Sequence, residues 1–279
     1  MSPWAGDSHV IQSKFVGVDF AVSVALPYRY DANDDPVPLL VVLDAHWMFG
    51  TVRDLATSMA MGRLIPRALV VGIGYPTDNL SEIAKFRQRD ATPTAATFPE
   101  GFRGSNPGSL GLGGASKFRN FLLRELLPWI EQHYRIGPPK MLIGHSMTAL
   151  FTVQTLLIQP EAFDGYLAAS PSLWWDKRVM LTMAADLLQQ RTDLPARVYL
   201  SAGAEEARPP PESFQMVANV TALAERLAGS QLPGLQLTFE VLPGENHHSP
   251  IGQSVSRGLR ALLSPFRDGD KPNRPGLLN

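Results

Sequence analysis

Ser146 has the surroundings of a serine nucleophile. It lies in the stretch MLIGHSMTAL (residues 141–150), where an apolar strand pattern runs into Gly144 and an apolar helix pattern begins at Met147. A serine on such a tight strand-to-helix turn is held out over the sheet, where its hydroxyl can reach a substrate carbonyl. The usual pattern is Gly-x-Ser-x-Gly, and Thr148 replaces its second glycine. The competing interpretation is a serine that only caps the helix.

A hydroxyl nucleophile needs a base, and histidine is the usual one. Of the six histidines, His247 and His248 follow a late strand pattern at 235–242. Their place agrees with the chain order nucleophile, acid, base of hydrolases that carry such a turn. We therefore expect the base in this pair, with a polar surface loop as the alternative.

The acid of such a site orients the imidazole and stabilises its cation. It belongs in the loop after the strand predicted at 198–202, which contains Glu205 and Glu206, with Glu212 further on. We favour Glu206, three residues past Gly203. Glu205 and Glu212 stay open, and for any one of the three the alternative is an ordinary exposed glutamate.

A tetrahedral intermediate needs backbone donors placed in advance. One is the N–H of Met147, the residue after the nucleophile. We assign the second to His46, in the loop after the strand predicted at 39–43. Simple loop packing of His46 and its neighbour Trp47 is the alternative.

Strand and helix patterns alternate along the chain, which predicts the α/β class, with a mostly parallel central sheet and helices on both faces. Residues 15–27 alternate like a half-buried antiparallel strand. We predict further strands at 39–43, 69–73, 141–144, 163–169, 198–202 and 235–242. Helices are predicted around 52–59, 118–130 (kinked at Pro128), 147–158, 212–227 and 254–263. Residues 92–114 read as a flap beside the site. Residues 1–264 are expected to form a single domain, and 265–279 a poorly ordered tail.

Composition limits the classes of function. The formal net charge is −1, and Lys and Arg form no run, which argues against nucleic-acid or membrane partners. Cysteine is absent, so disulfides and thiolate metal sites are excluded. The start of the chain has no signal-peptide pattern and no apolar run approaches a membrane span, which favours a cytoplasmic enzyme. No metal-ligand spacing or phosphate loop occurs, so we expect no cofactor and no metal.

From about Val16 to about Leu263 the sequence resembles the Putative esterase (esterase D-like) family of α/β hydrolases. It is most similar to the siderophore branch, which cleaves enterobactin or bacillibactin. The matching stretches are LDAH (43–46), RDATPT (89–94), GGA (113–115), IGHS (143–146), ASPSLWWD (169–176) and PGENH (243–247). The resemblance implies the α/β-hydrolase fold, ester hydrolysis with Ser146 as nucleophile, and His247 rather than His248 as base. It places Met147 and His46 on the oxyanion positions. Some members work with a Ser-His pair alone.

Four residues are predicted to contact a small-molecule ester. Trp174 and Trp175 follow a strand end and supply an aromatic wall, unless one of them is core. Arg87, with Arg89 nearby, flanks the same rim by resemblance and would hold an anionic group, unless it pairs with a carboxylate instead. Trp47 lies beside the oxyanion loop. Two rival functions use the same residues: acyl transfer to an alcohol, and a non-catalytic binding module on this fold.

Overall fold

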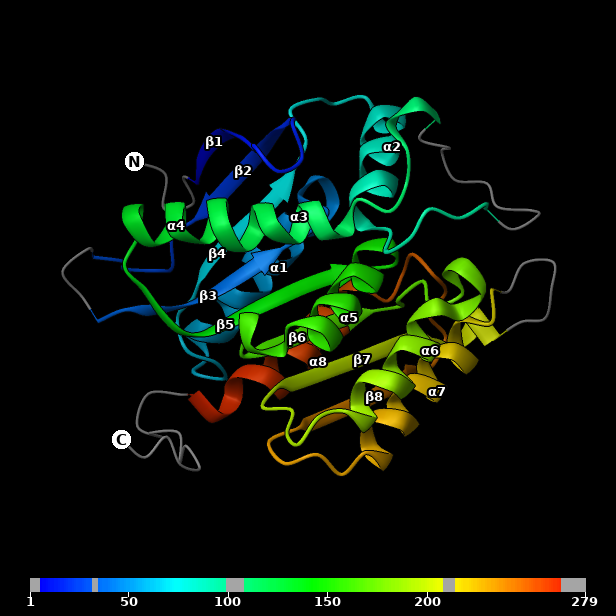
Figure 1. Ribbon diagram of the computed structural model, residues 1–279. Coiled ribbons are helices and arrows are strands. Elements are labelled where there is room, and N and C mark those ends of the chain that lie inside the picture. Colours follow the sequence, from blue (N-terminus) through cyan, green and yellow to red (C-terminus); the bar gives the residue numbers. More distant parts are fainter. Residues whose placement is uncertain (1–5, 32–34, 99–107, 208–213, 267–279) are drawn as a thin grey trace.

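Short apolar runs form the middle of one sheet. The computed structural model describes residues 6–31, 35–98, 108–207 and 214–266. In this part of the chain eight strands pair in the order β1-β2-β4-β3-β5-β6-β7-β8 (Figure 1). Only the β1–β2 and β2–β4 pairs are antiparallel. The strands are β1 Asp7–Gln12, β2 Asp19–Ala25, β3 Val37–Val42, β4 Leu69–Gly74, β5 Ile136–His145, β6 Gly165–Ala169, β7 Arg197–Gly203 and β8 Gln236–Leu242.

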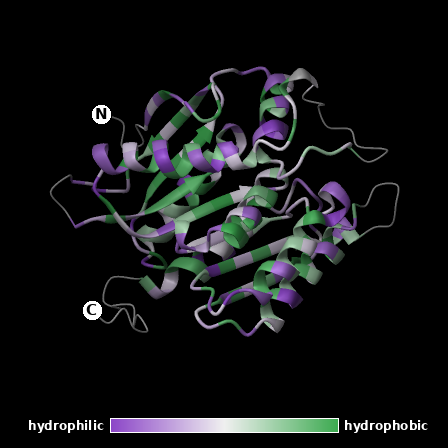
Figure 2. Cartoon of the chain, viewed as in Figure 1, coloured by the Kyte–Doolittle hydropathy of each residue, from purple (hydrophilic) through white to green (hydrophobic). Residues whose placement is uncertain are grey.

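The parallel strands in the middle of the sheet are buried on both faces, which is why they read as continuous apolar runs, whereas β8 at the edge is mostly half-buried. β3 and β4 are buried at every residue. β2 alternates instead as far as Val24, with Phe20, Val22 and Val24 buried and the residues between them half-buried. Figure 2 shows the central strands in hydrophobic colours and the outer helices in mixed colours. The predicted α/β class, with a mostly parallel sheet, is confirmed.

Helices cover both faces of the sheet. On one face Met48 and Val52 of α1 (Ala45–Met61) and Val255 of α8 (Ile251–Leu263) pack with Leu40 and Val42 of β3. Successive strand residues point to opposite faces, so Leu39 and Val41 join the core on the other side. That side is covered by α2 Leu80–Ala91, α3 Ala115–Phe121, α4 Leu127–His133, α5 Met147–Ile158, α6 Trp175–Gln189 and α7 Met216–Gly229.

Three elements were not predicted from the sequence: β1, α2 and α6. β1 is an edge strand that pairs with β2 alone among the described strands, and its side chains are mostly exposed, so it lacks an apolar pattern. The predicted strand at 15–27 is also shorter in the structure. Gly17, at φ 80°, turns the chain before β2 begins at Asp19.

The helix predicted across residues 118–130 is interrupted. α3 and α4 are joined by a π-helical turn at Leu122–Leu126, and Pro128 is in the first turn of α4. Proline has no N–H and its ring clashes with the carbonyl four residues earlier. The wider turn immediately before it accommodates that clash within a nearly continuous helical segment.

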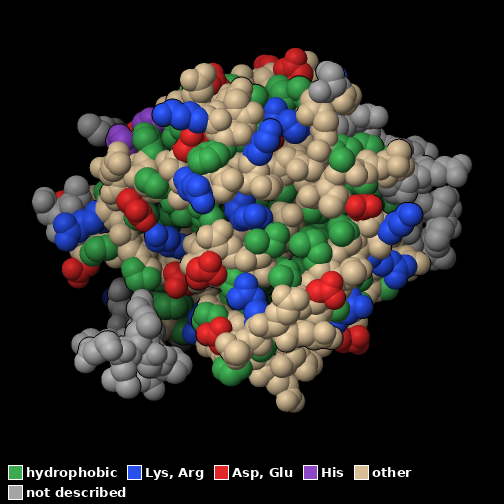
Figure 3. All heavy atoms as spheres, in the orientation of Figure 1, with side chains coloured by type: hydrophobic (Ala, Val, Ile, Leu, Met, Phe, Trp, Pro, Cys, Tyr) green, Lys and Arg blue, Asp and Glu red, His purple; other side chains and the backbone are tan. Residues whose placement is uncertain are grey.

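Several expectations fall partly or wholly outside the described residues. The predicted flap includes residues 99–107, which are outside the described ranges. Of the tail predicted at 265–279, the first two residues belong to the helical turn Ser264–Phe266, and residues 267–279 are outside the described ranges. No helix in the described ranges is long and apolar enough to cross a bilayer, and the cytoplasmic location stays a prediction. Figure 3 shows acidic and basic side chains interspersed on the face seen there.

Candidate active site

The predicted site residues follow the carboxyl ends of parallel strands. His46 follows β3, Ser146 follows β5, Glu206 follows β7 and His247 follows β8. Parallel strands end at the same edge of a sheet, and ligands of such sheets bind there. The fold therefore brings together loops that are far apart in the sequence.

Ser146 lies on a strained turn between β5 and α5. Its φ of 60° and ψ of −115° are unusual for a residue with a side chain, and such conformations persist where the surroundings enforce them. Its N–H donates to the carbonyl of Ala169 at 2.9 Å. A Cβ on Gly144 would lie 2.5 Å from the Thr148 carbonyl oxygen. Glycine is therefore required at 144 for the turn to close, and the serine hydroxyl is left at the edge of the sheet.

Ser146, His247 and Glu206 form one hydrogen-bonded chain. His247 Nε2 is 2.9 Å from Ser146 Oγ, and His247 Nδ1 is 2.7 Å from Glu206 Oε2. Because an ionised carboxylate only accepts, Nδ1 carries the proton and Nε2 is free to accept from the serine. This is the arrangement in which a histidine can take a proton from a hydroxyl.

Glu206 is held by more than His247. Its Oε1 accepts the Ser170 hydroxyl at 2.6 Å and the Gly203 N–H at 2.8 Å. Burial raises the pKa of Glu206, but the bonds from His247, Ser170 and Gly203 outweigh it and keep that pKa below its ordinary value. Of the alternatives, Glu212 lies outside the described residues, and Glu205 follows β7 in the same turn as Glu206.

His145 connects the end of β5, next to Ser146, to the loop that carries His247. Its Nε2 donates to the carbonyl of His247 at 2.9 Å, and the two rings are 5.0 Å apart. Burial, the neighbouring His247 and Arg87 lower the pKa of His145 well below the ordinary histidine value. The imidazole is therefore neutral and acts as a fixed donor, which positions the backbone of His247.

We expect the His145→Gln variant to lose less stability than wild type on acidification from about pH 7.5 to about pH 5.5. Below the ordinary histidine pKa of 6.5, the unfolded chain binds a proton at residue 145 that the folded protein excludes. The free energy of unfolding therefore decreases as the pH is lowered, by up to about 1.4 kcal/mol per pH unit from this group. Glutamine offers an N–H to the His247 carbonyl but does not titrate. Urea unfolding at both pH values measures the difference, and equal losses would contradict a buried neutral imidazole.

Two backbone N–H groups are available for an oxyanion. Met147 and His46 are in the first turns of α5 and α1, and neither N–H has an acceptor among the described residues. The imidazole of His46 packs against Gly74. Its Nε2 accepts the N–H of Tyr75 at 3.1 Å. The assignment of the two N–H groups to the oxyanion stays a prediction.

Ser172, which lies beside Ser146, was not predicted from the sequence as a site residue. Its Oγ is 3.3 Å from Ser146 Oγ, and its N–H donates to the Ser146 carbonyl at 3.1 Å. It is fully buried. The signal was present, because Ser172 belongs to the stretch ASPSLWWD that carried the family resemblance. That stretch also supplies Ser170, the second side-chain partner of Glu206.

The two tryptophans predicted to line the substrate site have different environments. Trp175 is 1% exposed, and its Nε1 donates to Thr94 Oγ1 at 3.1 Å. It belongs to the core, so its predicted contact with substrate is corrected. Trp174 is half-buried and packs against Phe214 with 4.5 Å between ring centroids. Trp47 is 39% exposed, and both Trp47 and Trp174 remain candidates for substrate contact.

The arginines at the rim are engaged with carboxylates. Arg87 donates to Asp44 Oδ1 and to the carbonyl of His145, both at 2.8 Å, and its guanidinium lies 5.6 Å from the Trp47 ring. Arg89 makes two bonds of 2.7 Å to the buried carboxylate of Asp90. Both arginines thus pair with a carboxylate, which was the alternative to substrate binding. A substrate contact by Arg87 stays a prediction. Within the described ranges no three His, Asp or Glu side chains gather as metal ligands.

Comparisons with known proteins show which proteins this chain is similar to. The family model described as "Putative esterase" matches residues 13–260. Ferri-bacillibactin esterase BesA of Bacillus subtilis (strain 168) is 36% identical over 239 residues, which cover 82% of this chain and 79% of the relative. Siderophore triacetylfusarinine C esterase of Aspergillus fumigatus is 27% identical over 277 residues and 90% of each chain. The crystal structure of an IroE-like serine hydrolase from Shewanella oneidensis has a TM-score of 0.83 at 26% identity, and covers 94% of this chain and 81% of that one.

Proposed function

Because this chain belongs to the Putative esterase family and is an esterase, we propose that it cleaves carboxylic esters through an acyl-enzyme on Ser146. His247 is the general base and Glu206 is the acid that orients it. The observation that carries the proposal is the position of His247, 2.9 Å from the Ser146 hydroxyl and 2.7 Å from the Glu206 carboxylate. The buried partners of Glu206 support the same roles, because they keep the carboxylate ionised.

The proposed reaction has two halves. Ser146 Oγ adds to the ester carbonyl as its proton passes to His247 Nε2. The carbonyl oxygen becomes an oxyanion that accepts the N–H groups of Met147 and His46. The tetrahedral intermediate then expels the alcohol, which takes the proton from His247, and an acyl ester on Ser146 remains. Water adds to that ester while His247 takes its proton, and the acid leaves as Ser146 is reprotonated.

We propose a small-molecule ester of the siderophore type as the substrate. The support is that the named relatives are esterases of ferri-bacillibactin and of the siderophore triacetylfusarinine C. The half-exposed rings of Trp47 and Trp174 are suited to aromatic or acyl groups. The scattered charge of the chain does not by itself select a strongly anionic substrate.

The first test is intact mass after treatment with a fluorophosphonate, beside hydrolysis of a p-nitrophenyl ester series. We expect one adduct per chain, mapped to Ser146 by peptide digestion, and turnover that the reagent abolishes. Added acceptor alcohols separate hydrolysis from acyl transfer by their products. A folded protein with neither an adduct nor turnover would contradict the proposal and favour a non-catalytic binding module.

We expect Trp174→Ala and Trp175→Ala to differ in kind. Trp174→Ala should raise KM for aryl esters by about 3- to 10-fold with little change in Tm, because a partly exposed ring is lost from the rim. Trp175→Ala should instead cost about 3–5 kcal/mol of stability, since it empties a core site. Steady-state kinetics with phenyl and short alkyl esters and urea unfolding measure the two effects. An unchanged KM in folded Trp174→Ala removes Trp174 from the substrate side.

A further inference from the structure

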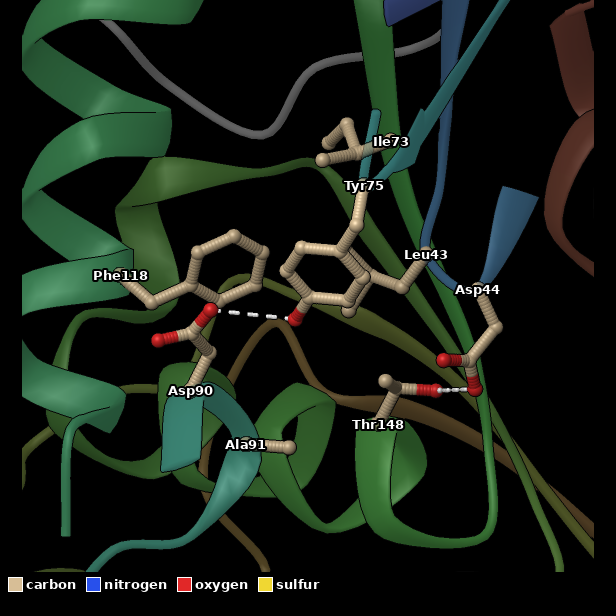
Figure 4. A pocket seen from close by; sticks show the side chains of 8 residues that line it. All are labelled: Leu43, Asp44, Ile73, Tyr75, Asp90, Ala91, Phe118 and Thr148. Atoms are coloured by element: carbon tan, nitrogen blue, oxygen red, sulfur yellow. Dashed lines mark hydrogen bonds between the residues drawn. The ribbon is translucent and has the colours of Figure 1, made fainter. Parts of the chain in front are cut away.

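Thr148, which replaces the second glycine of the elbow pattern, makes contacts that glycine lacks. It is buried, and its Oγ1 is 2.7 Å from Asp44 Oδ2 (Figure 4). The same oxygen accepts the N–H of His145 at 3.0 Å and lies 2.9 Å from the His145 carbonyl. A hydroxyl has one proton, and the shorter contact to a charged acceptor is the stronger bond. Thr148 therefore joins the start of α5 to the carboxylate of Asp44.

Asp44 is turned away from the helix that it precedes. It occupies the N-cap position of α1 with φ 56°, where an aspartate usually accepts N–H groups of the first helical turn. Its side chain has no such partner in α1 as described. Its Oδ1 instead accepts from Arg87, which also donates to the carbonyl of His145. The first-turn N–H of His46 is thereby left without a side-chain acceptor from this cap.

Two bridges thus connect the loop after β3 to the turn after β5. One runs from Asp44 to the Thr148 hydroxyl, and the other from Asp44 through Arg87 to His145. The Asp44 side chain is 3% exposed and that of Arg87 12% exposed. Charge-assisted bonds in such a buried setting are strong and hold a fixed geometry. Asp44 is two residues before His46, and Thr148 directly follows Met147.

We propose that Asp44, Arg87 and Thr148 form a clamp that sets the spacing between the N–H groups of His46 and Met147. The three are positioning residues, and this role rests on the proposed function, in which those N–H groups stabilise the oxyanion. The clamp accounts for Thr148, because a glycine there could not bind Asp44. Donors that are misplaced by a fraction of an ångström stabilise the transition state less while still admitting the substrate.

A small cavity beside the clamp affects the choice of variants that can test the clamp. It measures about 10 Å³, and it is lined by Asp44, Thr148, Tyr75, Asp90, Phe118 and neighbours (Figure 4). That is room for about one water molecule. Thr148→Gly would enlarge this space and admit water in place of the hydroxyl. Thr148→Val keeps the volume and removes only the hydroxyl, so it is the cleaner variant.

The test compares Thr148→Val with Thr148→Ser, which restores the hydroxyl, and with Thr155→Val as the matched control. Thr155 is a buried threonine of α5 whose hydroxyl donates to the Phe151 carbonyl, away from the clamp. Each variant is assayed with p-nitrophenyl butyrate and with phenylboronic acid, which adds to a serine oxygen to give a tetrahedral anion resembling the intermediate. Circular dichroism confirms folding at the assay temperature. Wild type and Ser146→Ala are run in the same panel.

We expect Thr148→Val to lower kcat by about 10- to 100-fold with KM changed less than about threefold. The boronic acid should bind more weakly by the same factor as kcat/KM falls. Thr148→Ser should stay within about threefold of wild type, and Thr155→Val should match wild type in both readouts. If Thr148→Val does not fold, Asp44→Asn carries the test with the same expected pattern.

The outcomes separate the clamp from the function beneath it. Turnover that depends on Ser146, with kcat and boronate affinity unchanged in folded Thr148→Val, overturns the clamp alone. A rise in KM with constant kcat also overturns it, because it would assign Thr148 to substrate binding. Wild type without Ser146-dependent turnover overturns the proposed function, and the clamp with it.

Discussion

Replacing Ser146 by alanine should lower kcat for p-nitrophenyl esters by about 10⁴- to 10⁶-fold and abolish the fluorophosphonate adduct. The alanine side chain has no oxygen to add to the carbonyl, so the acyl-enzyme cannot form. The remaining rate comes from binding and from the backbone donors, which stay in place. The fold should tolerate the change, because the Ser146 side chain bonds only to His247 and Ser172 among the described residues.

Ser230→Ala is the control for that experiment. Ser230 ends α7, and its hydroxyl donates to the carbonyl of Leu227. This variant should keep both the adduct and the turnover of wild type. Thermal unfolding of each variant separates a catalytic loss from a folding loss. A Ser146→Ala protein that still turned over substrate at more than about a tenth of the wild-type rate would exclude Ser146 as the nucleophile.

Replacing Glu206 by glutamine should lower kcat by about 10²- to 10⁴-fold. Glutamine has nearly the shape of glutamate, but it carries no charge to stabilise the imidazolium that forms as Ser146 is deprotonated. Its amide can also present an N–H to His247 Nδ1. The proton of the neutral ring then moves to Nε2, which can no longer accept from the serine. The deficit should lie in kcat, because the Glu206 side chain is buried and contacts His247, so the change should affect the base rather than substrate binding.

Glu205→Gln is the matched control, since Glu205 is the neighbouring residue of the same turn. It should stay within about threefold of wild type in kcat. A large loss in Glu205→Gln with none in Glu206→Gln would move the acid to Glu205. Only a small loss in Glu206→Gln would instead indicate a site that works with the Ser-His pair.

Together, the variants also distinguish the roles of different groups in the site. The Ser146→Ala and Glu206→Gln variants should lose activity without a change in substrate binding, whereas Trp174→Ala should change KM. Thr148→Val differs from these variants, because it is expected to lower kcat and the affinity for the boronic acid together. These patterns follow from the role proposed for each group: the nucleophile for Ser146, support of the base for Glu206, substrate contact for Trp174, and positioning of the oxyanion donors for Thr148.

Much of the site was predictable because its signals are local. The turn at Ser146 needs only a strand, a glycine at 144 and a helix in succession, and all three are legible in ten residues. The buried parallel strands are continuous apolar runs, so their number and order along the chain were largely predictable. The edge strand β1 and the helices α2 and α6 were missed, because exposed or mixed faces leave weak patterns.

By itself, the sequence determined the fold class, the elbow serine, the loop that carries His247 and the membership of an esterase family. The tertiary structure decided which side chains meet. It placed Glu206 against His247, put Trp175 in the core, and joined Thr148 to Asp44 across 104 positions of the chain. Such contacts depend on β3 lying beside β5 and β7 beside β8, and that order arises from packing over the whole sheet. Local pattern fixes what an element is, whereas side-chain partners follow from which elements become neighbours.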